Sequence, residues 1–287
     1  MTAKVAIVTG ASSGIGAATA RRLNAMGYTV YAAARRLELM APLAEVGIKP
    51  VRVDVTDDAA LTSLVEHVIA ESGRVDVLVN NAGYGAMGAF EDVSMAEARR
   101  QVDVNLFGLA RLTQLVLPHM RRQCTGYIFN ISSIGGKIYV PLGSWYHATK
   151  FAIEGLSDTL RLEVAPFGIH VVVVEPGAID TEWHGVASEN LTATSTQGAY
   201  AGQAAVVEKV LSGGRFASSP DVVAKAIGRA LTARRPRTRY AVGLGAKPVI
   251  YARRVLPDRV VDAMVRLTFG VAGRVFGVLK TDPVKAG

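Results

Sequence analysis

Residues 5–16 read VAIVTGASSGIG, and they determine how the rest of the chain is expected to fold. The first five are apolar and mostly β-branched, which is typical of a strand buried on both faces of a parallel sheet. The glycines and serines that follow allow a tight turn into a helix. The start of such a helix offers amides and a positive dipole to a pyrophosphate. A glycine turn also occurs where no ligand binds. The interpretation as a phosphate-binding turn therefore depends on the strand before it and the helix after it.

Similar apolar runs recur along the chain and alternate with segments of helical spacing. The further predicted strands are residues 29–33, 51–55, 77–80, 127–131 and 171–174, with a short strand near 240–242. Helices are predicted over residues 57–71 and from the capping box at Ser94 to Pro118, and again over about 220–233. This alternation predicts an α/β fold, a single Rossmann-type doubly wound parallel sheet with helices on both faces.

One domain is expected to span residues 1–287. Residues 1–180 form its core, and residues 181–218 form a substrate flap, because Gly, Ser, Thr and Ala are frequent over 187–214. Residues 219–287 supply a helix, the short strand and a basic helical extension. From Arg234 onward there are twelve Lys/Arg against three Asp/Glu, whereas the preceding residues hold twenty against twenty-one. The formal charge of +8 is therefore a property of this tail.

Composition favours a cytoplasmic protein. The single cysteine, Cys124, excludes an intrachain disulfide and is typical of a reducing compartment. No leader peptide is expected, because the first strand begins at Val5. The best candidate for a membrane span, residues 263–279, contains Arg266 and Arg274, which disfavour such a span.

A second stretch, ISSIGGKIYVPLGSWYHATK at residues 131–150, contains the candidate chemistry. Tyr146 and Lys150 are four residues apart and share one face of a helix. A nearby ammonium favours the phenolate and lowers the pKa of a tyrosine. Ser133, thirteen residues before Tyr146, can hydrogen-bond a substrate oxygen while the tyrosine transfers its proton. Alone, the Y-x-x-x-K pattern is most often an ordinary helix start.

Ala34, Arg35 and Arg36 follow the second strand. NAD-binding folds place a carboxylate there for the ribose 2′-hydroxyl, whereas guanidinium groups pair with a 2′-phosphate. The sequence therefore favours NADP(H) over NAD(H), unless both arginines are merely solvated. Asp54, expected to end the third strand, can accept a hydrogen bond from the adenine amino group.

Taken in order, the motifs resemble those of the short-chain dehydrogenase/reductase family over roughly residues 4–181. They are TGASSGIG, Asn80-Asn81-Ala82-Gly83, Asn105, Ser133, Tyr146-x-x-x-Lys150 and Pro176-Gly177. The softer pattern YHATKF and the long C-terminal segment resemble the 17β-hydroxysteroid dehydrogenase-like branch and its retinol dehydrogenase relatives. Ser13 stands where some NADP(H)-preferring members have a basic residue.

The resemblance implies a catalytic tetrad of Asn105, Ser133, Tyr146 and Lys150. Tyr146 would be the general acid/base, and Lys150 would lower its pKa and bind the nicotinamide ribose. Ser133 would hold the substrate oxygen, and Asn105 a water that relays protons. The implied cofactor contacts are Gly10, Ser12, Ser13, Gly14, Ile15, Gly16, Arg35, Arg36, Asp54, Val55, Asn81, Ala82, Gly83, Tyr146, Lys150, Pro176, Gly177, Ile179 and Thr181.

The resemblance thus implies an NADP(H)-dependent oxidoreductase that interconverts a carbonyl and an alcohol. Apolar residues at 84–90 and 138–142, with Trp145 and Trp183, are expected to line the pocket, so a steroid-, retinoid- or aliphatic ketone- or aldehyde-like substrate is predicted. The same side chains can instead pack the core or an interface. No metal site is expected from five scattered histidines, nor any nucleic acid, and a homodimer or homotetramer is predicted.

Two other functions stay open. One is a non-catalytic NADP(H)-binding regulatory protein, which would have no need of the tetrad. The other is a membrane-peripheral protein that acts through its basic tail. From Pro257 an amphipathic helix is predicted, with Arg259, Asp262 and Arg266 on one face and an apolar face opposite. That apolar face is formed by Val260, Val261, Met264 and Thr268 and continues with Phe269, Val271, Val275 and Phe276. Closure of the substrate pocket or contact with a second subunit is favoured over a membrane surface.

Overall fold

The computed structural model describes residues 3–212 and 217–269, and a seven-stranded parallel sheet forms its centre. The strands, in the order in which they lie in the sheet, are β3 (Lys49–Arg52), β2 (Thr29–Ala34), β1 (Val5–Thr9), β4 (Val77–Asn80), β5 (Gly126–Ile131), β6 (Ile169–Pro176) and β7 (Arg239–Val242). All neighbouring strands are parallel. The strand order reverses between β1 and β4, which is where ligands bind in open sheets of this kind.

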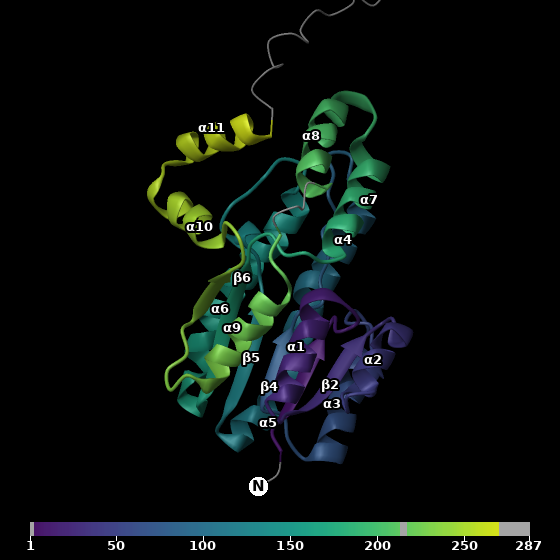
Figure 1. Ribbon diagram of the computed structural model, residues 1–287, viewed down its shortest axis with the longest axis vertical. Helices are drawn as coiled ribbons and strands as arrows, with labels where there is room; N and C mark the ends of the chain where they lie inside the picture. The colour runs from purple at the N-terminus through teal and green to yellow at the C-terminus, as the bar shows by residue number, and fades with distance from the viewer. Residues whose placement is uncertain (1–2, 213–216, 270–287) are drawn as a thin grey trace, which may run out of the picture.

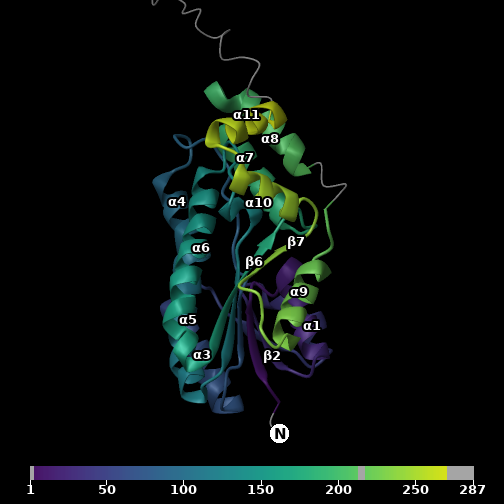
Figure 2. The ribbon, with the colours of Figure 1, turned by 90° about the vertical axis from the view of Figure 1, so that its left-hand side faces the viewer.

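Helices cover both faces of the sheet, so the predicted doubly wound α/β fold is confirmed. On one face lie α1 (Gly14–Ala25) and α9 (Asp221–Thr232), as Figures 1 and 2 show. On the other face lie α3 (Asp58–Ser72), α5 (Gly108–Gln123) and α6 (Ser144–Val164). A short α2 (Ala41–Ala44) connects β2 to β3.

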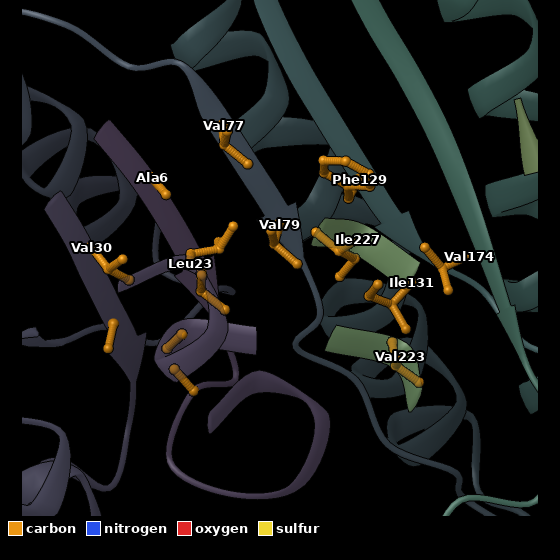
Figure 3. Close-up of a cluster of buried hydrophobic side chains, with 14 of the residues drawn as sticks. Ala6, Leu23, Val30, Val77, Val79, Phe129, Ile131, Val174, Val223 and Ile227 are labelled. Carbon is orange, nitrogen blue, oxygen red and sulfur yellow. The ribbon is translucent and has the colours of Figure 1, made fainter. Parts of the chain in front are cut away.

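The core consists of two apolar layers, one on each side of the sheet. Ala6 and Val8 of β1 point to the side of α1 and α9, while Val5 and Ile7 point to the side of α3 and α5. Figure 3 shows the first layer, where Leu23 of α1 and Ile227 of α9 lie among strand side chains. Because successive strand residues point to opposite faces, burial of both faces requires the uninterrupted apolar runs seen in the sequence.

The third strand departs from its predicted position. It covers Lys49–Arg52 instead of residues 51–55. Beyond it, the Asp54 carboxylate accepts hydrogen bonds from the Thr56 backbone N–H and hydroxyl, at 3.0 and 2.8 Å. Aspartate favours such local turns over a ladder, so the chain leaves the sheet before Asp54 and this residue follows the strand instead of ending it.

The single helix predicted from Ser94 to Pro118 is instead three segments. They are α4 (Met95–Val102), a π-helical turn (Asp103–Phe107) and α5. Ser94 caps α4 as predicted, accepting from the Glu97 N–H, but the Glu97 carboxylate accepts from the Tyr84 hydroxyl instead of returning to the cap. The helix α5 does not end at Pro118 but continues through it to Gln123. Met120, beyond the proline, is fully buried in the core.

The flap and the tail lie at the end of the sheet where the strands have their carboxyl ends (Figure 1). The flap contains α7 (Trp183–Ser195) and α8 (Ala201–Ser212), and the tail contains α10 (Ala246–Val255) and α11 (Asp258–Thr268). In α11, Val261 is buried but Val260 and Met264 are 43% and 50% exposed, so the predicted apolar face is only partly covered by this chain. The predicted apolar residues Val271, Val275 and Phe276 lie outside the described residues. Among the described helices, none has the length and hydropathy of a membrane span.

Candidate active site

Three neighbouring segments bring the predicted tetrad together at the carboxyl ends of the strands. Ser133 follows β5, Tyr146 and Lys150 lie in the first turns of α6, and Asn105 lies in the π-helical turn. The Lys150 ammonium nitrogen is 5.8 Å from the centre of the Tyr146 ring. It donates a hydrogen bond of 2.9 Å to the Ile131 carbonyl. Ser133, and not its neighbour Ser132, hydrogen-bonds Tyr146.

Asn105 is held in place by three hydrogen bonds. Its amide oxygen accepts from the Tyr84 N–H, and its amide nitrogen donates to the Tyr84 carbonyl and the Thr149 hydroxyl, at distances of 2.9–3.1 Å. A side chain on Gly83 would come 3.1 Å from the Asn105 amide oxygen and 3.8 Å from the Lys150 ammonium. Gly83 therefore leaves space where these two residues converge. A π-helical turn is frequent at functional sites because it redirects one side chain out of the helical register.

Burial shifts the pKa values of Tyr146 and Lys150 in opposite directions. It raises the pKa of Tyr146 to about 12, against the hydrogen bond from Ser133. It lowers the pKa of Lys150 to about 8, against the charge of Glu154. The sequence predicted a lowered tyrosine pKa from the Tyr–Lys spacing, and this structure shows the reverse. Removal of the phenolate from water is the largest cause of the raised pKa, and the Ser133 hydrogen bond only partly opposes it.

His147 fixes the loop that precedes α6. The Val140 N–H donates to its Nε2 at 3.0 Å, so the ring proton is on Nδ1, which lies 2.9 Å from the Gly135 carbonyl. Burial lowers the pKa of this imidazole. These contacts give His147 a structural role, since both ring nitrogens hold residues 135–140 against the helix.

The glycine turn after β1 leaves room only for backbone. Gly10 and Gly14 have φ of 63° and 51°, the left-handed region that favours glycine. A side chain on Gly16 would lie 2.2 Å from the Gly10 carbonyl oxygen. Asn81 donates to the Thr9 carbonyl at 2.9 Å, which joins the NNAG motif to this turn. The predicted residues Ser12, Ser13, Ile15, Ala82 and Gly83 lie in the same two segments.

The two arginines that were predicted to bind the 2′-phosphate, Arg35 and Arg36, have different surroundings. Arg36 donates to the Ser12 and Ser13 hydroxyls, each at 3.3 Å, and forms an ion pair of 2.6 Å with Glu182. Arg35 is exposed. Burial opposes ionisation of Asp54, but the Thr56 hydrogen bonds and then the charge of Arg35 lower the pKa of this carboxyl overall. No pattern in the sequence selects Glu182, because a carboxylate after Thr181 is unexpected at a phosphate site.

The segment after β6 crosses the glycine turn. A side chain on Gly14 would lie 2.9 Å from the Thr181 methyl group, so Thr181 covers this turn. Gly177 packs against the Leu244 backbone, where an added side chain would come within 2.4 Å, and Ile179 is buried. Val55, by contrast, lies against the start of α5, 2.5 Å from where a side chain on Gly108 would be.

An apolar cluster adjoins Tyr146 on the side of the flap. Its buried members are Met87, Ala89, Leu142, Tyr146, Ala187, Leu191, Ala204, Val207 and Phe269. Trp183 packs against this cluster, with its ring 5.1 Å from that of Tyr146. Trp145 was also predicted to line the pocket, but it stacks on the exposed Phe90 ring. Phe269, which belongs to the apolar face predicted in the tail, is one of the buried members.

The tail covers one side of this cluster through α11. The Tyr139 hydroxyl donates to Asp262 at 2.8 Å, and the Arg253 guanidinium lies 5.6 Å from the centre of the Tyr139 ring. These contacts join α10 and α11 to the loop between Ser133 and Tyr146. Among residues 3–212 and 217–269, no group of His, Cys, Asp or Glu has the arrangement of a metal site.

Comparison with known proteins shows what this chain resembles. It matches the family described as short chain dehydrogenase over residues 4–192. It is 34% identical over 279 residues to a probable short-chain type dehydrogenase/reductase of Helicobacter pylori, covering 94% of this chain and 98% of that protein. It is 43% identical over 182 residues to 3-ketodihydrosphingosine reductase of Bacteroides thetaiotaomicron, covering 63% of this chain and 66% of that one. A solved serine dehydrogenase complexed with NADP+ superposes with a TM-score of 0.74 at 27% identity, covering 83% and 94% of the two chains.

Proposed function

The chain belongs to the short chain dehydrogenase family, and from this membership we propose that it is an NADP(H)-dependent enzyme that interconverts a carbonyl and an alcohol on a lipophilic substrate. The observation that supports this most directly is the meeting of Ser133, Tyr146 and Lys150 beside an apolar cluster. A hydride-transfer site needs both a proton donor and a pocket for the rest of the substrate.

The residues around the glycine turn fit a dinucleotide. A side chain at Gly16 would collide with backbone, so the chain at this turn offers amides and open space instead. The Ser12 and Ser13 hydroxyls and the Arg36 guanidinium meet beside the start of α1, and together they form a donor set for phosphate oxygens. Arg35 and Arg36 favour NADP(H) over NAD(H), in agreement with the NADP+ bound to the serine dehydrogenase.

Proton transfer is assigned to Tyr146. At neutral pH its phenol is protonated, because burial raises its pKa to about 12. In carbonyl reduction the phenol gives its proton to the substrate oxygen, and Ser133 donates a hydrogen bond to the same oxygen as negative charge develops. Lys150 stabilises the phenolate that remains. When bound, the nicotinamide supplies the hydride in this direction and accepts it in the reverse one.

The walls of the site support a lipophilic substrate. The cluster beside Tyr146 contains Met87, Leu142 and Leu191, all buried, and aromatic rings at Trp183 and Phe269. A pocket of this composition binds ligands chiefly by apolar contact. The matched 3-ketodihydrosphingosine reductase is named for a long-chain lipid ketone, which supports a substrate of steroid-, retinoid- or aliphatic ketone- or aldehyde-like character. A homodimer or homotetramer in the cytoplasm stays a prediction.

The test is turnover of NADPH with steroid ketones, retinal, aliphatic aldehydes and long-chain ketones. We expect at least one of these to be reduced by the wild type. Tyr146→Phe keeps the ring and removes the proton, so it should reduce kcat by about a hundredfold or more while NADPH binding is retained. Equal turnover by wild type and Tyr146→Phe would contradict the mechanism, and NADPH binding without any turnover would favour a regulatory protein.

A further inference from the structure

A buried group of charged side chains lies one helical turn beyond Lys150. Glu154 follows Lys150 by four residues on α6, and Glu175 lies on the adjacent strand β6. Their side chains are only 6% and 4% exposed. Burial of two carboxylates is expensive, and an apolar pair of similar size is often at least as stable. The fold alone therefore does not explain these residues.

Two cations face the carboxylates from other elements. The Lys137 ammonium is 2.8 Å from Glu154 and 3.7 Å from Glu175. The Arg239 guanidinium, from β7, is 3.1 Å from Glu154 and 3.4 Å from Glu175, and it also contacts Asp158 on the next turn of α6. Lys137 and Arg239 are thus the cations paired with Glu154, and Glu175 and Asp158 share them. The fifth charged group near Glu154 is Lys150, one turn earlier on the same helix.

This group is in contact with the segment that carries Lys150. A side chain on Gly136 would lie 2.7 Å from the Ser132 hydroxyl, 3.0 Å from the Lys150 carbonyl and 3.1 Å from Cγ of Glu154. Gly136 therefore allows Glu154 to pack against the backbone of the catalytic segment. One carboxylate oxygen of Glu154 and the Ser132 hydroxyl are buried without a hydrogen-bond partner among the described residues.

In the described part of the chain, Lys150 forms no ion pair. Its ammonium instead donates a hydrogen bond to the Ile131 carbonyl. Burial favours the neutral amine and lowers the pKa of Lys150, and the charge of Glu154 opposes this shift. A neutral lysine could not stabilise a phenolate at Tyr146. The charge of Glu154, four residues along the same buried helix face, thus favours the ammonium form of Lys150.

We propose that Glu154 is a positioning residue whose carboxylate keeps Lys150 in its ammonium form, and that Lys137 and Arg239 hold this carboxylate in place through their ion pairs with it. The inference rests on the proposed function, since it assigns Lys150 its role beside Tyr146. It predicts that removal of a negative charge and removal of a positive charge from the buried group shift the pKa of Lys150 in opposite directions. Glu154→Gln removes a negative charge, and Lys137→Gln removes a positive one.

The experiment measures the pKa of Lys150 directly, by NMR titration of 15N-labelled lysine side chains. The Lys150 signal is assigned as the one that is missing in Lys150→Met. In Glu154→Gln we expect this pKa to fall by about one pH unit, as for loss of one neighbouring charge. In Lys137→Gln it should rise. Because Lys137 is more exposed than Glu154, this second variant preserves the test if Glu154→Gln folds poorly.

Turnover links this shift to catalysis. The alkaline limb of kcat/KM for carbonyl reduction should move to lower pH in Glu154→Gln and to higher pH in Lys137→Gln, while activity near pH 6 changes by no more than about twofold. The matched control is Asp158→Asn, which loses a carboxylate from the same helix and the same arginine but lies a further turn from Lys150. It should leave the limb in place, and Glu154→Asp should restore part of the shift.

Each failure has a distinct signature. An unchanged Lys150 pKa in both glutamine variants, or a loss of activity that is equal at all pH values, would overturn the role of Glu154. Movement of the limb by the same amount in Asp158→Asn would do the same. A wild type that shows the Lys150 shift in its variants but reduces no carbonyl would instead contradict the proposed function.

Discussion

The ion pair between Arg36 and Glu182 leads to a quantitative prediction about cofactor binding. Glu182 lies just after Thr181, and its carboxylate accepts from the Ser13 hydroxyl at 3.0 Å and from Arg36 at 2.6 Å. These are the donors that a phosphate would use. We therefore expect the Glu182 carboxylate to compete with the cofactor for Arg36, so that Glu182→Gln tightens NADPH binding and Arg36→Ala weakens it.

The two effects differ in size because the ion pair is exposed. The side chains of Arg36 and Glu182 are 48% and 56% accessible, and such pairs contribute about 0–1 kcal/mol. Release of Arg36 from Glu182 should therefore improve NADPH affinity by at most about fivefold. A charge-assisted phosphate contact contributes about 1.5–3 kcal/mol, so loss of Arg36 should weaken NADPH by roughly ten- to a hundredfold.

The assay is fluorescence titration of NADPH and NADH against the single variants and the double variant. Arg36→Ala should affect NADPH much more than NADH, because only NADPH has the 2′-phosphate. The gain from Glu182→Gln should vanish when Arg36 is already alanine, as a double-mutant cycle requires for residues that act through each other. Arg21→Ala is the matched control, since it removes the same charge from the cleft that Ser13 and Glu182 also line.

Two results would refute this reasoning. A gain from Glu182→Gln that persists unchanged in the Arg36→Ala background would show that Glu182 does not act on Arg36. A loss in Arg36→Ala that is equal for NADPH and NADH would show that this arginine does not recognise the 2′-phosphate. In the second case Arg35→Ala, measured in parallel, becomes the variant expected to discriminate between the nucleotides.

Two further predictions concern stability and the tail. Burial, and after it repulsion from Glu154, raises the pKa of Glu175 from 4.5 to about 7. The neutral carboxyl is thus favoured in the folded state, so stability is fully present below about pH 4.5 and is lost as the pH rises to about 7. Thermal melting at several pH values should show that Glu175→Gln removes this loss of stability, which is at most about 3 kcal/mol. An equal dependence of Tm on pH in the wild type and in Glu175→Gln would contradict this prediction. Truncation after Leu256 removes Phe269 and the Tyr139–Asp262 hydrogen bond, so it should lower kcat/KM for lipophilic carbonyls and spare NADPH binding. Binding of the full chain to anionic vesicles, with unchanged turnover after truncation, would instead favour the membrane function of the tail.

The sheet could be predicted from sequence because burial on both faces leaves a continuous apolar run. Six of the predicted strands overlap the observed ones closely, and the seventh, β3, is displaced because Asp54 turns the chain away. Pro118 was misinterpreted for a related reason. The proline was interpreted as the end of the helix. The helix α5 instead continues to Gln123, which places Met120 in the core.

The candidate site was predictable where its residues occur in a fixed spacing and was missed where they come from distant segments. Tyr146 and Lys150 are one turn apart, so any helix brings them together. Glu182 and Arg239 approach the site from the flap and β7, and no local pattern marks them. The pKa of Tyr146 could not be predicted from residue spacing either, because the extent of its burial depends on the flap and the tail.

The pKa values of Tyr146 and Lys150 predict how each reaction direction depends on pH. Reduction uses the protonated phenol, which persists well above neutral pH because burial raises its pKa to about 12. Its kcat/KM should therefore stay level from pH 6 and fall as Lys150, with a pKa of about 8, loses its charge. Oxidation needs the phenolate of Tyr146 beside a charged Lys150. Its kcat/KM should therefore rise about tenfold per pH unit below pH 8 as the phenolate fraction grows, and level off above pH 8, where loss of the Lys150 charge offsets that growth. Because the two groups are coupled, the limbs belong to the pair and not to either residue alone. Stopped-flow measurement of both directions on one substrate tests this, and an oxidation rate that is independent of pH between 6 and 8 would show that the phenolate of Tyr146 is not the base.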